Sequence, residues 1–374
     1  MTVILVALTA VALFFLQQVV YKRLWSKSLK VNINFKDKTL NEGDEGWLIQ
    51  TVENAKRLPL PMCKVKFECN RALLFFDSGE TSVSDKYYRD EAFTVSSYKR
   101  VVRELKFTAK ERGFYSIDGF DVVGTDIFMS AQFVEHEDCH TEIYVYPVAL
   151  ERDLSEAAIR QLTGEMLSRR RFIEDPFEYV GVREYQPFDE LKNINWKATA
   201  KTGDLKVNTH GYTARQGVRI FLNLKDDGVL KHKENVENSI RFAVRMCMEF
   251  IGSGDRVALF ANIPDVITGK PLIIPAGTGE SHMEAILRGL ARLDTDKRHF
   301  DFAETFRDEV FEEKSDYMTV FVSTPSANDF DGFVREYHET GKDLRHFILC
   351  QEGDKYEANV ENAVFTTVIC MEKK

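Results

Sequence analysis

One pentapeptide carries the residue types of a zinc hydrolase. The segment His136-Glu137-Asp138-Cys139-His140 has two histidines four residues apart and a glutamate directly after the first. On a helix this spacing places both imidazoles on one face, where they bind zinc while the glutamate acts as general base. The flanking residues, QFV before and IYVY after, are typical of a strand instead. Residues four apart on a strand lie roughly 13 Å apart, too far for one zinc ion, so the sequence disfavours metal hydrolysis.

Two glycine-containing segments could be phosphate-binding loops. Residues 252–254 read GSG and residues 277–279 read GTG. Neither is followed by the Lys-Ser/Thr pair of a nucleotide loop, and neither has the full dinucleotide-binding spacing. Both segments are therefore predicted to be ordinary turns.

The cysteines and carboxylates indicate no catalytic centre. No cysteine stands in a nucleophile motif, and no pair of carboxylates is placed for acid–base work. Thinly spread cysteines favour reduced, mostly buried thiols over a disulfide framework. We therefore expect a protein that is not an enzyme and needs no cofactor. The six cysteines are Cys63, Cys69, Cys139, Cys247, Cys350 and Cys370.

The composition predicts a folded chain of several domains. A length of 374 residues favours two or three domains, and 44% hydrophobic residues can fill their cores. This excludes a disordered chain and a membrane protein with many spans. The net charge of -9 argues against nucleic acid as a partner.

An apolar run opens the chain. Residues 3–20 (VILVALTAVALFFLQQVV) contain no charge, and at ~1.5 Å per residue they are just long enough to cross a bilayer core. A cleaved signal peptide and a buried core helix are the alternatives, but the run lacks a basic start and a good cleavage site. We expect residues 1–22 to be a single transmembrane anchor.

The flanks of this run predict its orientation. Tyr21 and Trp25 suit the interfacial region of a bilayer. Basic residues follow the run, and no acidic residue appears before Asp37, so the positive-inside rule places the bulk of the chain in the cytoplasm. These basic residues are Lys22, Arg23, Lys27 and Lys30.

The remaining chain divides by its hydrophobic periodicity. Residues 28–148 contain short alternating strands separated by turn signals, which predicts a β-sandwich of immunoglobulin-like size. Residues 149–177 have helical spacing and are predicted to be a linker helix. Strands and helices alternate over residues 216–374, which predicts a largely parallel sheet with helices on both faces.

A dense mixture of aromatic, charged and glycine or proline residues occupies positions 178–215. Its core, Gly-x-Arg-Glu-Tyr-x-Pro, is followed by acidic residues and by an Ile-x-Trp-x-Ala-x-Ala-Lys run. This segment resembles the signature of the bacterial family called domain of unknown function 58 (DUF58). Phe188 stands where the family usually has glycine, and Asn195 where it often has aspartate. The matching residues are Gly181, Arg183, Glu184, Tyr185, Pro187, Asp189, Ile194, Trp196, Ala198, Ala200 and Lys201.

The resemblance implies a multidomain α+β architecture. Such proteins have amino-terminal membrane helices, a β-rich region and a carboxyl-terminal von Willebrand A-like domain with a doubly wound α/β fold. Within the signature, residue types allow a charge-paired network that either pins the segment down or presents a surface to a partner. The network would contain Arg183, Glu184, Asp189 and Lys197 around Tyr185 and Trp196.

The same resemblance bears on metal binding. Von Willebrand A domains often bind a divalent cation through Asp-x-Ser-x-Ser after the first strand. Here Asn223 replaces the aspartate and Lys225 replaces the first serine, so a cation beside the ammonium would be repelled. We expect a degenerate site without metal, in which Asp226 and Asp227 could hold an ion only weakly.

The resemblance also implies a role. Related proteins are commonly encoded near MoxR-type AAA ATPases and are thought to help assemble or activate other complexes. We therefore expect a single-pass membrane protein that acts as a cytoplasmic accessory or scaffold for such an ATPase. The alternative is a cation-dependent ligand-binding von Willebrand A module. The sequence does not specify the oligomeric state.

Overall fold

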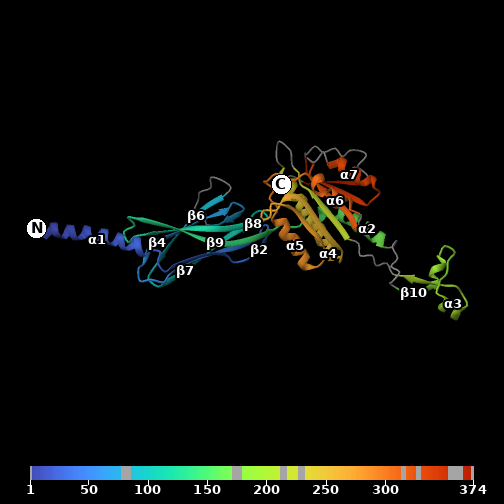
Figure 1. Cartoon of the computed structure of the whole chain (residues 1–374), viewed down its shortest axis with the longest axis horizontal. Helices are drawn as coiled ribbons and strands as arrows, with labels where there is room; N and C mark the ends of the chain where they lie inside the picture. The colour runs from blue at the N-terminus through green and yellow to red at the C-terminus, as the bar shows by residue number, and fades with distance from the viewer. Residues whose placement is uncertain are drawn as a thin grey trace. The chain divides into compact units, whose positions relative to one another are not determined.

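The computed structural model describes residues 2–76, 86–170, 179–210, 217–225, 232–312, 317–325, 330–352 and 365–371 (Figure 1). The chain forms two compact units, Met1–Val148 and Ala149–Lys374. The boundary coincides with the predicted end of the β-rich region.

The first unit begins with helix α1, Thr2–Leu24. Its most apolar window of 18 residues has a mean hydropathy of 2.4 and is not buried within the protein. By length and composition, α1 is therefore able to cross a membrane. Its last turn holds Lys22 and Arg23.

A β-sandwich follows α1, as the alternating pattern predicts. One sheet has the order β1-β3-β7-β5 and the other the order β2-β9-β8-β4-β6. Alternate side chains of both sheets point into one shared core, which includes Ile33, Leu48 and Phe107 from the first sheet and Val65 and Ile117 from the second. The strands are β1 Leu29–Phe35, β2 Thr39–Asn41, β3 Glu45–Asn54, β4 Leu60–Asn70, β5 Leu73–Phe75, β6 Lys86–Val95, β7 Lys99–Ala109, β8 Gly113–Thr125 and β9 Gln132–Tyr146.

The second unit contains a six-stranded sheet with the order β14-β13-β12-β15-β16-β17. All neighbouring pairs are parallel except β13 and β14. Every residue of β12 is buried because both faces of the sheet are covered, which explains why most of its residues are apolar. The strands are β12 Gly217–Asn223, β13 Arg256–Pro264, β14 Pro271–Gly277, β15 Tyr317–Ser323, β16 Leu344–Gln351 and β17 Thr366–Met371.

Helices cover both faces of this sheet (Figure 1). Helices α2 Arg152–Arg170, α4 Lys233–Gly252 and α5 Glu280–Ala291 share one core, and helices α6 Phe302–Phe311 and α7 Phe330–Glu339 share the other. Helix α2 forms within the segment that was expected to be a linker helix, residues 149–177. Ala158 and Leu162 of α2 are buried in the first core, so α2 is part of the α/β unit.

All six cysteines are free thiols. Burial raises the pKa of Cys63 to about 11 and the pKa of Cys247 to about 12, so both are protonated and unreactive at neutral pH. Cys350 and Cys370 are opposite one another on β16 and β17, with their sulfur atoms 2.8 Å apart.

Candidate functional site

The signature residues fold into a small structure of their own, which we call the signature module (residues 179–210). Strand β10, Tyr179–Glu184, pairs with β11, Lys206–His210, in antiparallel fashion. Between them lie a 3-10 turn, η1 Leu191–Asn193, and the short helix α3, Trp196–Thr202. Ile194 and Val207, which form an isolated bridge, are its two buried apolar residues.

A bidentate ion pair closes the turn after β10. The Arg183 guanidinium donates to both oxygens of Asp189, over 2.6 Å and 2.5 Å. Asp189 Oδ2 also accepts from the backbone N–H of Gln186 at 2.8 Å. The hydrogen bonds from Arg183 are the main cause that lowers the pKa of Asp189. Because a forked donor matches a carboxylate in its plane, this pair holds the turn in one geometry.

Helix α3 begins at Asn195. Its Oδ1 accepts from the backbone N–H of Ala198 at 2.9 Å, and its Nδ2 donates to Asn208 Oδ1 at 2.7 Å. An aspartate, the usual residue of the family here, could cap the helix but could not donate to Asn208. Asparagine therefore keeps the cap and adds a link to β11. Gly203, with φ +83°, ends the helix in the left-handed conformation.

The predicted charge network forms only in part. Arg183 and Asp189 pair, but Glu184 contacts Lys206 Nζ at 3.2 Å, its cross-strand neighbour, and not Lys197. Tyr185 donates its backbone N–H to Leu205. Lys197 and Lys201 are exposed on α3, and Pro187 is exposed in the turn. A Cβ added at Gly181 would meet no atom within 4 Å, so packing does not require glycine there.

The large apolar side chains of the signature module face solvent. Trp196 is 67% exposed and Phe188 is 78% exposed. Trp196 is therefore not enclosed by the charged residues, contrary to the predicted network. Phe188, at the position where the family signature is expected to have glycine, is an exposed ring in the turn. The other exposed apolar residues of the signature module are Tyr179, Val180, Val182, Leu191 and Leu205.

The second predicted site lies at the carboxyl ends of β12 and β13. Asn223 Oδ1 accepts from Asn262 Nδ2 at 2.8 Å, and Asn262 Oδ1 accepts from the backbone N–H of Leu224 at 2.9 Å. The Asn223 oxygen that would replace an aspartate ligand is thus engaged by an amide. Lys225 follows, with its carbonyl oxygen accepting from Thr324 Oγ1. Asp226 and Asp227 lie outside the described residues. Sequence reasoning missed Asn262, for which a polar residue inside a buried strand was the available signal.

The histidines of the zinc-like string lie on β9. His136 Nδ1 contacts Asp121 Oδ1 at 2.7 Å, and His140 Nδ1 contacts Asp118 Oδ1 at 3.0 Å. The hydrogen bond with Asp121 is the main cause that raises the pKa of His136. Each imidazole therefore has its own carboxylate on β8. Among the described residues, no three histidine, cysteine or acidic side chains converge as a metal site.

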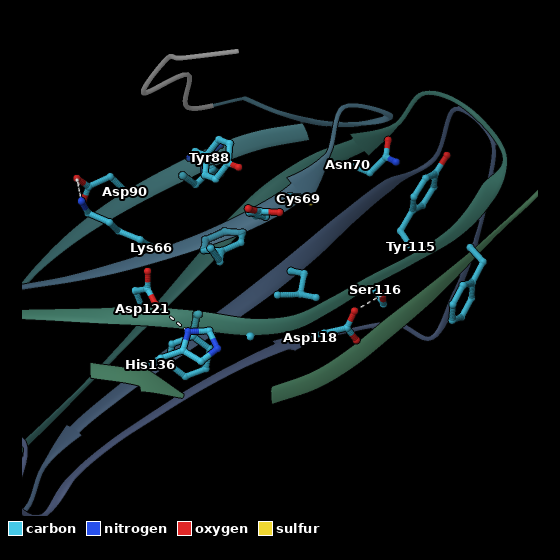
Figure 2. A pocket seen from close by; sticks show the side chains of 17 residues that line it. Lys66, Cys69, Asn70, Tyr88, Asp90, Tyr115, Ser116, Asp118, Asp121 and His136 are labelled. Carbon is cyan, nitrogen blue, oxygen red and sulfur yellow. Dashed lines mark hydrogen bonds and ion pairs between the residues drawn. The ribbon is translucent and has the colours of Figure 1, made fainter. Parts of the chain in front are cut away.

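A pocket of about 740 Å³ opens beside His136 (Figure 2). The ladder between β4 and β8 ends at Phe67 and Phe120, although β8 continues along β9 to Gly113. The pocket lies where these strands separate. Figure 2 shows Asp121, His136, Asp118 and Ser116 on its wall. On this wall His136 pairs with Asp121, Ser116 donates to Asp118, and Lys66 Nζ lies 3.9 Å from Asp90 Oδ2.

The signature module and the mostly parallel sheet define a chain of the α+β class. Residues 181–324 match the model of the family described as "Protein of unknown function DUF58". The match supports the DUF58 family and extends from β10 to the end of β15. No curated protein matches the sequence.

Several solved structures are similar to about a third of the chain. A cohesin module from a Clostridium perfringens family 33 glycoside hydrolase is 10% identical, with 30% of this chain and 95% of that chain covered and a TM-score of 0.22. A non-cellulosomal cohesin from Archaeoglobus fulgidus is 10% identical, with coverages of 34% and 97% and a TM-score of 0.22. The CARDB domain of a Pyrococcus furiosus protein is 13% identical, with coverages of 31% and 89% and a TM-score of 0.20. Similarities this weak carry no argument about this chain.

Proposed function

We propose that this chain is a membrane-anchored, cytoplasmic accessory protein that binds a MoxR-type AAA ATPase through its signature module. The observation that supports this proposal is the exposure of Trp196 and Phe188 on a module that buries only two apolar residues. Solvent-exposed aromatic side chains contribute nothing to a core, whereas at interfaces they are the commonest binding hot spots. Helix α1 would hold this surface at the membrane.

The supporting geometry is a rigid presentation of these side chains. The Arg183–Asp189 pair holds the turn that carries Phe188, and the Asn195 cap holds the first turn of α3, which carries Trp196. A surface that is ordered before binding loses less entropy when a partner docks. Lys197 and Lys201, both exposed on α3, add positive charge that would favour an acidic partner surface.

We further propose a von Willebrand A-like fold for the α/β unit. Five parallel strands, with the first in sequence, β12, inside the sheet between β13 and β15, and one antiparallel edge strand, β14, support this assignment. The alternative function, cation-dependent ligand binding, would need an acceptor oxygen at Asn223. That oxygen accepts from Asn262, so we favour the accessory role.

The test is the affinity of the detergent-solubilised full chain for a purified MoxR-type ATPase from the same source. We expect the double variant Phe188→Ala, Trp196→Ala to bind at least about tenfold more weakly, a loss of about 1.4 kcal/mol. Phe76→Ala removes an exposed ring from the sandwich unit and is the matched control, with unchanged affinity. No binding by the parent chain, or equal binding by the double variant, would contradict the proposal.

A calorimetric titration with Mg²⁺ or Mn²⁺ tests the alternative. Binding that is lost in Asp227→Ala would favour the cation-dependent module over the accessory role.

A further inference from the structure

The two polar residues of the apolar run have partners far along the chain. Gln17 Nε2 donates to Asp126 Oδ2 at 2.6 Å, and Gln18 Nε2 donates to Ser130 Oγ at 3.0 Å. Both partners belong to the loop between β8 and β9, which we call the hairpin tip (residues 126–131). The glutamines therefore attach α1 to the sandwich and are not isolated polar groups in an apolar helix.

One face of α1 makes this attachment. Among the partly or fully covered residues near its carboxyl end, Phe14, Gln17, Gln18 and Tyr21 lie at helical spacing. The Tyr21 hydroxyl donates to the carbonyl oxygen of Pro59 at 3.0 Å. The Trp25 ring, which follows the helix, stacks on Phe133 of β9. Helix α1 and the sandwich are thus joined at several points along about two turns of helix.

The hairpin tip reaches past the glutamines along α1. The ring of Phe128 lies 5.7 Å from the ring of Phe14, centroid to centroid. Phe14 precedes Gln17 by three residues, which is about 4.5 Å along the helix axis toward the apolar end. The residues of the tip itself are apolar and more than half exposed: Ile127 is 51% exposed, Phe128 is 64% exposed and Met129 is 55% exposed.

The surroundings of the hairpin tip match a lipid headgroup layer. The turn between β3 and β4 contacts α1 through Pro59 and contacts the turn between β6 and β7 through Lys56. Together these elements place exposed basic side chains and the 69% exposed Tyr98 at the same end of the sandwich. Basic residues attract anionic lipid, and tyrosine favours the interface. The basic residues are Lys22, Arg23, Arg57 and Lys99.

We propose that the hairpin tip is a second membrane contact, with Ile127, Phe128 and Met129 inserted into the boundary of the acyl chains beside α1. Interfacial segments bury their apolar side chains about 5–10 Å deep, which agrees with the level of Phe14 on the helix. The lipid bilayer is the occupant that α1 itself indicates, because the exposed tip residues are continuous with its apolar surface. The contact would fix the orientation of the sandwich unit on the membrane. This inference rests on the proposed anchor function of α1.

Fluorescence quenching by lipids brominated near the headgroup tests this inference. The full chain carrying Phe128→Trp, and separately Ile127→Trp, is reconstituted in phosphatidylcholine–phosphatidylglycerol vesicles. The signal of the parent chain, with its three tryptophans, is subtracted. The matched control is Phe76→Trp, because Phe76 lies far from the proposed membrane contact. The Phe76 N–H donates to the carbonyl oxygen of Lys106, which is seven residues, or roughly 23 Å, along β7 from Lys99.

We expect both tip variants to lose most of the added fluorescence and to emit at shorter wavelength, while the control keeps its signal. Variants that float with the vesicles but are not quenched would overturn the tip contact and leave the anchor intact. A parent chain that does not float would overturn the anchor and this inference together. Protection of the tip by a second copy or by a protein partner would appear as a blue-shifted signal without quenching, and would also overturn it.

Discussion

The family match covers most of the signature module and strands β12 to β15 of the six-stranded sheet, yet these two regions use aromatic residues in opposite ways. In the sheet, Phe221, Phe260 and Phe321 are buried and contact one another, with ring centroids 4.4 Å and 5.6 Å from Phe221. In the signature module, Trp196 and Phe188 are exposed. The sheet buries these aromatic side chains in its core when the unit folds. The signature module leaves its aromatic side chains exposed and available for contact with a partner. This difference in exposure points to the signature module, and not to the sheet, as the functional surface.

The largest expected effect is on the free energy of unfolding, when an aromatic side chain is truncated in each of the two regions. Phe221→Ala should lower the free energy of unfolding of the α/β unit by about 3–5 kcal/mol, because it opens a cavity among packed rings. Trp196→Ala should change it by less than about 0.5 kcal/mol. Denaturant-dependent hydrogen exchange of peptides from β12 and β15 measures both. Equal losses of unfolding free energy in the two variants would contradict the distinction between a buried and an exposed aromatic residue.

A second pair of variants compares buried and half-exposed amides. Asn262→Ala should lower the free energy of unfolding by about 1–3 kcal/mol, because Asn223 Oδ1 and the N–H of Leu224 lose their buried partner. Asn208→Ala removes a half-exposed hydrogen bond to Asn195, which water can replace, so a loss below about 1 kcal/mol is expected. The reverse order in urea unfolding would contradict this reading.

Mild acid should lower the stability of the six-stranded sheet through His346 of β16. Burial lowers the pKa of His346 to about 3, so the folded imidazole stays neutral while the unfolded one protonates below about 6.5. Stability is therefore lost as pH falls below that value. Between pH 7.5 and 5.5 the loss is about 1.4 kcal/mol. In His346→Gln this pH dependence should disappear from urea unfolding curves, and its persistence would assign the effect to another group.

The smallest effect concerns the turn of the signature module. Since Arg183 lowers the pKa of Asp189, the ion pair is complete above the ordinary carboxyl pKa of about 3.9 and is lost as pH falls through the lowered value. Amide exchange of residues 179–210, corrected for intrinsic rates, should thus stay constant from pH 7 to 5. In Asp189→Asn it should already be faster at pH 7. No change in that variant would show that the ion pair does not order the turn.

The elements of both units could be predicted because their signals are local. The alternation in residues 46–53 predicted a strand that the structure has as β3, and the apolar run in residues 218–224 predicted β12. Whether the helix in residues 149–177 is a linker or packs against the sheet could not be predicted from local signals. A helical period shows that one face is apolar, but only the packed structure shows that Leu162 covers the sheet.

The amino-acid sequence alone specified the apolar amino-terminal segment, the β-rich region, the region of alternating strands and helices, and the signature that supports the family. Only the tertiary structure decided which polar groups meet. Gln17 and Asp126 are 109 residues apart, and Asn223 and Asn262 are separated by 39. Periodicity reports which face of an element is apolar, whereas a contact between distant residues depends on how all the intervening elements pack. For that reason the signature was recognisable from sequence, but the exposure of Trp196 was not.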